Sequence, residues 1–570
     1  MITNIYKFLV VKRSKYTIFI TSIIISFFTI FLRNFNLYPS VFTDEQFHSY
    51  FARLVDFKNI EVPSYIFYLI YKSTNLCGEN FLECGRLLNT LFFITACIYI
   101  YKISKKYTSF ANAILIFLLI LLGPLNIYTA YFMPESLYFL FFWFYIYFLF
   151  IIKIKKNFVW SLNGLILGLM SLIKPHAIFL IPCIIIYLIR VEEKSEVKNV
   201  LLNIFFLFIF FFITKYFIQI LFIGNIKDSL TIFGKDYNQS LYHYFPKDLN
   251  YFIIVFKNAL INIKGNLLFL SLIFYLPIIL CIKNILTKNV PQFNRNLSIF
   301  IILIFSTLII IFGIFTGSAT SVLDYEKANR LNTRYFYFLY PLFLILIFCE
   351  LSNFKKKISI KNKIISSLII IIFIIYSLLT QLNEYVPTYH LVDGPLYRGF
   401  TYNKITFNFL TILGLSNIIL WFYKERLAIK FYCYFFLVLT FFLTSIPSNK
   451  ELIFYKNPTI YDNVAMHIKK LLLVEKNKNL LIINEEQKNI GEITKILFHL
   501  DNIHNSFKII KNFEFNKKNI TTLIPEFTNE SLNHKNSIKW VLLINYKNNI
   551  NFPTRYIDNN FILFNLSDFK

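Results

Sequence analysis

The sequence contains few charged residues, and those it has are unevenly placed. Only 16% of its 570 residues are Asp, Glu, Lys or Arg, whereas a soluble globular domain carries about 25%. Apolar residues make up 56%. Up to about residue 446 they gather in runs of about 16–22 residues, long enough to cross a hydrocarbon core of about 30 Å as helices. The composition therefore excludes an ordinary soluble protein.

Features that would indicate other classes of protein are also missing. There is no Gly-rich phosphate-binding loop, no pair of histidines spaced to bind zinc, and no metal-binding pattern among the seven cysteines. The net charge of +27 would suggest nucleic acid binding in a soluble protein. No basic amphipathic stripe is present to follow a phosphate backbone, so a nucleic acid partner and a zinc site are both disfavoured.

The positive charge instead follows the pattern of a membrane protein. Lys7, Lys12, Arg13 and Lys15 precede the first apolar run, and no small-residue cleavage site follows it. This pattern indicates an uncleaved first helix with a cytoplasmic N-terminus. Each predicted inner loop is short and basic, which satisfies the positive-inside rule along the whole chain.

This alternation predicts about 13 transmembrane helices. A long loop at about 36–86 is expected outside, where Cys77 and Cys84 can pair if the compartment is oxidising. Residues 251–265 read as an amphipathic helix lying on the membrane. The predicted spans are about 17–35, 87–101, 109–127, 137–152, 158–173, 176–190, 199–223, 266–282, 298–316, 335–351, 364–381, 405–422 and 430–446.

The C-terminal 447–570 differ from the rest. Buried strands are predicted at 480–484, 540–545 and 561–564, and a helix at 491–500. The expected architecture is therefore an all-α polytopic membrane bundle over 1–446 and a small soluble α/β domain over 447–570. An odd number of spans places that domain outside the cytoplasm.

Asp44 and Glu45, just after the first span, are the first candidates for chemistry. Adjacent carboxylates at a membrane surface are costly if partly buried, and such a group can act as a general base or bind a divalent cation. The same residues also fit a helix start, with Thr43 as the N-cap and the acids in the first turn. Both interpretations stay open.

Three further residues at predicted outer ends of spans have two interpretations each. Glu135 follows a proline and fits an ordinary helix start or an acid of a site. Lys174 and Arg334 fit interfacial side chains that extend toward water or groups that hold a phosphate, for which the Arg fork is well suited.

In series, these residues resemble the GT-C superfamily of membrane glycosyltransferases. The bacterial branch related to protein O-mannosyltransferases and lipid A aminoarabinose transferases is the most similar, chiefly over 40–190. One departure is Glu135, where the family often has Asp. The matching motifs are Asp44-Glu45, Pro63, Gly85-Arg86, Pro124, Pro134-Glu135, the Gly164 to Gly168 span with Lys174-Pro175, and Arg334-Tyr335 to Tyr340-Pro341.

The resemblance implies transfer of a hexose or pentose from a polyprenyl-phosphate donor to a lipid, glycan or protein acceptor. It implies that Asp44 is the base, supported by Glu45, and that Glu135 is a second acid. Lys174, Arg334 and Arg86 would hold the donor phosphate. His48 and Tyr335 are further candidates, an inverting reaction is expected, and a divalent cation on Asp44 and Glu45 is left open.

The expected location is a cell membrane, the inner one in a Gram-negative bacterium, with the C-terminal domain extracytoplasmic. The alternative is a transporter, flippase or polymerase of polyprenyl-linked glycans. The predicted spans hold very few charges, with Lys215 the main exception, whereas coupled transporters usually carry some near the middle of the membrane.

Overall fold

The structure is a computed structural model in which two compact units are described. The first comprises residues 1–35 and 56–453, and the second comprises residues 36–55 and 454–570. The described residues are 2–39, 42–60, 62–151, 156–191, 196–233, 248–287, 290–321, 326–331, 333–353, 360–387, 391–473, 480–484, 490–500, 505–509, 540–544, 554, 556–558 and 561–565.

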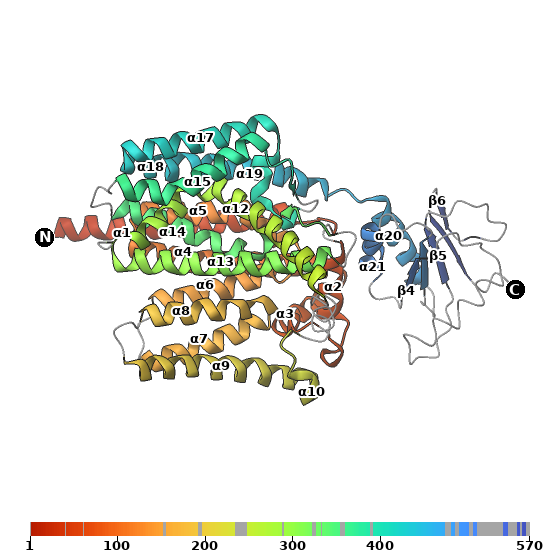
Figure 1. Cartoon of the computed structure of the whole chain (residues 1–570). Coiled ribbons are helices and arrows are strands. Elements are labelled where there is room, and N and C mark those ends of the chain that lie inside the picture. The colour runs from red at the N-terminus through yellow and green to blue at the C-terminus, as the bar shows by residue number, and fades with distance from the viewer. Residues whose placement is uncertain are drawn as a thin grey trace. The chain divides into compact units, whose positions relative to one another are not determined.

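The first unit is a bundle of helices that run side by side (Figure 1). Two residue pairs, Arg330–Leu331 (β1) and Val386–Pro387 (β2), form a short parallel bridge at one end of it. The helices are α1 (Ile2–Asn34), α3 (Tyr65–Tyr71), α4 (Phe81–Tyr107), α5 (Phe110–Leu121), α6 (Glu135–Ile151), α7 (Lys156–Ser171), α8 (Leu180–Val191), α9 (Val197–Ile223), α10 (Ile226–Ser229), α12 (Leu249–Leu286), α13 (Gln292–Thr320), α14 (Tyr340–Ser352), α15 (Ile360–Thr380), α16 (Arg398–Thr401), α17 (Lys404–Tyr423), α18 (Glu425–Phe431) and α19 (Leu437–Phe454).

The predicted membrane bundle is confirmed. Among the described residues, 8 helices are long and apolar enough to cross a membrane, or 9 if the bent pair Phe110–Leu121 and Pro124–Ala130 is one span. Four shorter apolar helices accompany them, at Glu135–Ile151, Phe158–Ser171, Pro175–Val191 and Tyr337–Ser352. With the bent pair counted once, these segments agree with the predicted number of about 13.

Two predicted boundaries differ from the structure. Residues 251–265 are not a separate surface helix, because they form the first part of α12, which continues through the predicted eighth span. The predicted end of the last span at 446 falls inside α19, which accommodates Pro447 and runs on to Phe454. In both places the helix continues past the polar residues or the proline at which the sequence predicted that it would end.

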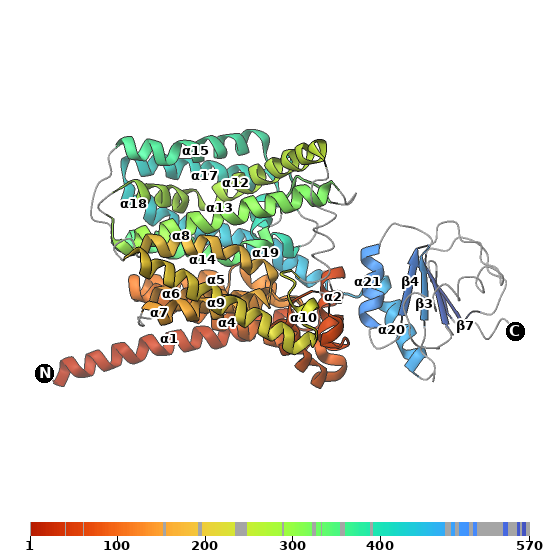
Figure 2. The same cartoon turned by 60° about the horizontal axis from the view of Figure 1, so that its bottom comes forward.

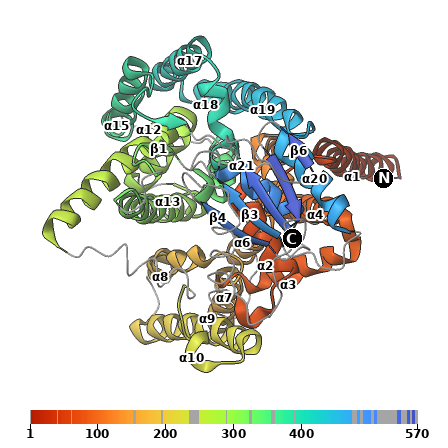
Figure 3. The ribbon, with the colours of Figure 1, turned by 90° about the vertical axis from the view of Figure 1, so that its right-hand side faces the viewer.

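Tight helix pairs organise the bundle. Seen end-on in Figure 3, α7, α8 and α9 form one edge, and α15, α17 and α19 form the opposite edge. The most extensive pairs are α12 with α13 and α7 with α9, which also run side by side in Figure 2. Gly164 faces the backbone of Leu207 and Phe211 on α9. Because glycine has no side chain, the two helices can approach each other closely at this position.

The described residues between 56 and 80 form an irregular part of the bundle. Short helices cover it, including η1 (Phe57–Asn59), α3 and η2 (Lys72–Asn80). Cys77 and Cys84 form a disulfide there, the pairing that the sequence left conditional.

The second unit has the predicted α/β character. Its five-stranded sheet has the order β4-β3-β5-β7-β6. The strands are β3 (Leu480–Asn484), β4 (Asn505–Ile509), β5 (Trp540–Ile544), β6 (Tyr556–Asp558) and β7 (Phe561–Asn565). β3 pairs in parallel with β4 and β5, and β7 is antiparallel to β5 and β6.

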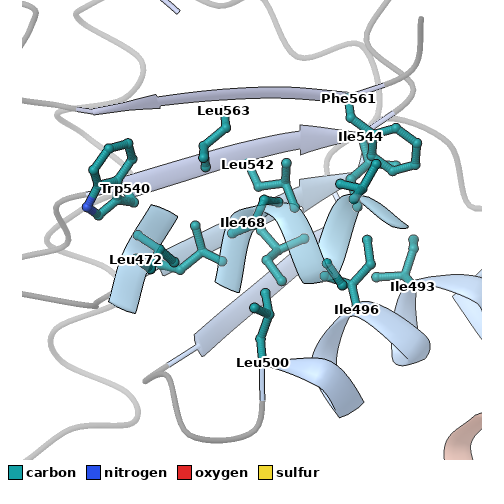
Figure 4. Packing of buried hydrophobic residues seen from close by; sticks show 14 residues of the cluster. Ile468, Leu472, Ile493, Ile496, Leu500, Trp540, Leu542, Ile544, Phe561 and Leu563 are labelled. Atoms are coloured by element: carbon teal, nitrogen blue, oxygen red, sulfur yellow. The ribbon is translucent and has the colours of Figure 1, made fainter. Parts of the chain in front are cut away.

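The described residues of this unit contain three helices: α2 (Phe42–Arg53), α20 (Ile460–Leu473) and α21 (Ile490–His499). Strand residues such as Leu542, Ile544 and Leu563 face Ile468 and Ile496 of the helices and form a fully buried core (Figure 4). α2 packs against α21, so the segment after the first span is part of this unit.

Candidate active site

Glu135 lies at the centre of a buried charge cluster in the first unit. Its side chain is 0% exposed, and a buried carboxylate is stable only when it is paired and hydrogen-bonded. Lys174 Nζ lies 2.7 Å and Arg334 Nε 2.6 Å from the same oxygen, Glu135 Oε1. Both cations are themselves largely buried, so the three groups form one shared ion cluster.

Local structure fixes each member of this cluster. Glu135 is the first residue of α6, where the helix dipole favours a negative charge. Lys174 has extended backbone and precedes η4 (Pro175–Phe179). Arg334 lies in η5 (Thr333–Tyr335), which is tied down by the bond from Thr333 Oγ1 to the carbonyl oxygen of Asp393 at 3.1 Å.

The three side chains that meet at Glu135 Oε1 carry two positive charges and one negative charge. The helix dipole at the start of α6 adds a positive potential. Within the described part of the chain, the second oxygen of Glu135, Oε2, is buried without a hydrogen-bond partner. An arrangement of this kind can attract a further anion and stabilise negative charge that develops during a reaction.

Aromatic rings form one wall beside the cluster. The ring of Tyr335 stacks on Phe312 with 4.2 Å between centroids. His176, two residues after Lys174, lies 5.0 Å from Tyr138 and 6.0 Å from Tyr335. Tyr335, predicted as a candidate from its motif, is therefore a packed wall residue next to Arg334.

Arg86 has a different setting from Lys174 and Arg334. Its Nη1 pairs with Glu83 at 2.7 Å, and its Nε donates to the carbonyl oxygen of Ala130 at 3.1 Å. Asn89, one turn further along α4, donates to the carbonyl oxygen of Tyr131 at 2.7 Å. These bonds join α4 to the segment that leads into Glu135, and phosphate binding by Arg86 stays a prediction.

Asp44, Glu45 and His48 lie on α2 in the second unit. α2 begins at Phe42, so Asp44 and Glu45 occupy its first turn as predicted, whereas Thr43 lies inside the helix rather than at its cap. Glu45 is 1% exposed, while Asp44 and His48 are half-buried. Their approach to the Glu135 cluster remains a prediction.

Sequence reasoning did not identify Tyr337 as part of the site. Its hydroxyl donates to the backbone carbonyl oxygen of Glu135, and the only sequence signal was its place three residues after Arg334. Arg330 also has a defined partner, Asp393 Oδ2 at 2.6 Å. His243 and His390 lie outside the described residues.

A metal site was left open by the sequence. In the described ranges, no group of three or more His, Cys, Asp or Glu side chains is close enough to hold a metal ion. Asp44 and Glu45 therefore supply two neighbouring carboxylates and no third ligand from these ranges.

The resemblance predicted from the sequence is confirmed by two comparisons with known proteins. Residues 61–217 match the family described as dolichyl-phosphate-mannose-protein mannosyltransferase. Among solved structures, the chain is similar to ArnT from Cupriavidus metallidurans, crystallised with undecaprenyl phosphate. The TM-score is 0.53 at 11% identity, over 95% of this chain and 97% of that chain. No curated protein sequence matches the chain.

Proposed function

We propose that the protein is a glycosyltransferase that moves a sugar from a polyprenyl-phosphate donor to an acceptor on the outer face of the membrane. The observation that carries this proposal is that Lys174 and Arg334 both pair with the same oxygen of the buried Glu135 carboxylate. These residues are 39 and 199 positions apart in sequence, so the fold brings them together.

The proposed reaction is a single displacement at the anomeric carbon of the donor sugar. The acceptor oxygen attacks that carbon, and Asp44 takes the proton of the acceptor hydroxyl. The bond between the anomeric carbon and the phosphate oxygen breaks, and polyprenyl phosphate leaves with the electron pair. Lys174 and Arg334 stabilise the charge that develops on this phosphate. A single displacement inverts the anomeric configuration.

Little further chemistry is required of the protein. The donor already carries a good leaving group, so positioning, one base and cationic stabilisation are sufficient. The undecaprenyl phosphate bound to ArnT supports a lipid carrier of the same class here. The charge alternation along the chain and the Cys77–Cys84 disulfide, a bond typical of oxidising compartments, support the outer location.

Lys174→Ala tests the proposal through lipid binding. The full-length protein in detergent should bind undecaprenyl phosphate, and the variant should lose at least about tenfold in affinity, or about 1.4 kcal/mol. Lys283→Ala is a matched control, because Lys283 Nζ pairs with the buried Glu350 at the same distance of 2.7 Å. Unchanged affinity in Lys174→Ala, or an equal loss in Lys283→Ala, would contradict the phosphate site.

A further inference from the structure

A second feature of the first unit is a cavity of about 380 Å³ at the end of the bundle that carries β1. This volume lies in the range of small-molecule sites, about 300–1,000 Å³. The cavity is lined by a turn after α15, by α16, by the first turn of α17 and by Phe269 of α12. β1 itself packs against α12 (Figure 3).

The cavity combines an aromatic floor with a polar rim. Tyr385, Tyr397 and Phe400 are buried in its floor, at 5% exposure or less. Asn383 and Thr401 are exposed at its rim and offer an amide and a hydroxyl. Binding sites for small polar molecules have this composition, with apolar contact area and a few placed hydrogen-bonding groups.

The rim is built in an unfavourable backbone conformation. Gln381 and Leu382 have φ values of 50° and 52°, and non-glycine residues held in this region cost about 1–3 kcal/mol each. The turn is nevertheless fixed, since Tyr385 N donates to Leu382 O at 2.9 Å and Asn329 Nδ2 donates to Glu384 O at 2.6 Å. Strain of this kind gathers at ligand sites, where the surrounding structure maintains it.

The cavity is also close to the charge cluster. Leu331 lines it, and Leu331 is three residues before Arg334. Three residues of chain span at most about 10 Å, so a molecule in the cavity can extend to the group that Arg334 holds.

This composition distinguishes between two kinds of ligand. A phospholipid headgroup would require several cations around its phosphate, but Lys404 is the only Lys or Arg among the described residues that line the cavity. A sugar ring presents an apolar face suited to aromatic rings, and hydroxyl groups suited to amide and hydroxyl partners. We propose that this cavity binds a sugar ring of a glycan acceptor, an inference that rests on the proposed glycosyltransferase function and names its acceptor class.

Saturation-transfer NMR on the full-length protein in nanodiscs tests the acceptor site. The probes are linear tetrasaccharides of N-acetylglucosamine, glucose, mannose and galacturonic acid. At least one should receive saturation from the wild-type protein. Thr401→Trp places an indole at the exposed rim and should reduce that affinity about tenfold or more. Tyr402→Trp is the matched control, because the neighbouring Tyr402 is 54% exposed and does not line the cavity.

Undecaprenyl phosphate binding, measured in the same preparations, separates this inference from the proposed function. Retained lipid binding with lost oligosaccharide binding in Thr401→Trp supports the acceptor site. No oligosaccharide binding by the wild-type protein, or equal binding by Thr401→Trp, overturns it even when the lipid binds. Failure of the wild-type protein to bind the lipid overturns the proposed function instead.

Discussion

Glu135 holds two cations on one oxygen although its side chain is fully buried. Removing one partner of a buried ion cluster leaves uncompensated charge and typically costs about 3–5 kcal/mol. Glu135 therefore does two things at once: it makes the burial of Lys174 and Arg334 tolerable, and it keeps both of them in place for an anion.

Glu135→Ala should consequently lower the free energy of unfolding by about 3–5 kcal/mol and weaken undecaprenyl phosphate binding in the protein that still folds. Glu135→Asp should retain more of both, because a carboxylate remains although it is one methylene shorter. Thermal unfolding of the purified protein in detergent measures the first effect. Equal stability of the alanine and aspartate variants would show that the charge is not the stabilising element.

Asp44→Asn examines the proposed general base. The amide keeps the shape of the side chain but cannot accept the proton, and loss of a general base typically lowers the rate about 10²–10⁴-fold. Lipid binding should survive, because Lys174 and Arg334 are unchanged. The readout is sugar transfer by isolated membranes at equal protein abundance.

Asp56→Asn is the control for that experiment, since Asp56 belongs to the same outer segment and its side chain makes no capping hydrogen bond to the helix that follows it. It should transfer sugar at the wild-type rate. Sugar transfer by Asp44→Asn at the wild-type rate would contradict the general-base role. Asp44 would then be only an acidic residue in the first turn of α2, where the helix dipole favours it.

Among the helices, the glycines of α7 show what a family motif means physically. A Cβ on Gly168 would lie 2.8 Å from Thr214 Cβ and 2.9 Å from Phe211 O, and one on Gly164 would collide with the carbonyl oxygen of Leu207. The sequence identified these glycines as a motif. The sequence could not show that these glycines let α7 approach α9, because the contacting residues of α9 are about 40 positions further along the chain.

Gly164→Ala should push α7 and α9 apart and destabilise the bundle by about 1–3 kcal/mol, the usual cost of overpacking. Gly414→Ala serves as the comparison, because its Cβ would lie 3.3 Å from an atom of Tyr275 and needs only a small adjustment. Thermal unfolding in detergent should therefore show a lower midpoint for Gly164→Ala than for Gly414→Ala. Identical midpoints would contradict the close helix contact.

In the second unit, Asp462 joins the start of α20 to the end of α21. It accepts hydrogen bonds from Thr459 N at 2.8 Å and Thr459 Oγ1 at 2.6 Å, and its other oxygen lies 2.9 Å from His499 Nε2. Burial alone would raise the pKa of Asp462, but the hydrogen bonds from His499 and Thr459 outweigh burial and hold its pKa below the ordinary value.

A depressed pKa of this kind stabilises the folded state above the ordinary Asp pKa of about 3.9, and the contribution is lost as the pH falls through the lower, folded-state value. Hydrogen exchange of the β3 and β5 amides in the full-length protein should show protection falling in acid, after correction for intrinsic exchange rates. Asp462→Asn should be less stable at pH 7 and lose less protection on acidification. Equal pH dependence in both proteins would contradict this role.

For the molecule as a whole, hydropathy and charge were sufficient to predict the membrane bundle and the α/β tail, because both signals are local. They were not sufficient where tertiary packing decides. The segment at 36–55 reads as an outer loop, yet α2 packs on α21. The pairing of Glu135 with Arg334, 199 residues away, has no local signal, although residue chemistry and the motif resemblance each marked both residues as candidates.

The topology of the whole chain remains the broadest prediction. An odd number of spans after a cytoplasmic N-terminus places the C-terminal unit outside. Lys424, Arg426 and Lys430 predict that the start of α18, between α17 and α19, lies inside. Alkaline phosphatase, which requires an oxidising compartment for its disulfides, should be active when fused after Lys570. It should be inactive when the chain is truncated and fused after Lys424, a fusion that keeps the preceding spans. Activity of the fusion after Lys424 would reverse the orientation and place the Glu135 cluster on the wrong face for an extracytoplasmic acceptor. Inactivity of the fusion after Lys570 at equal abundance would contradict the odd number of spans.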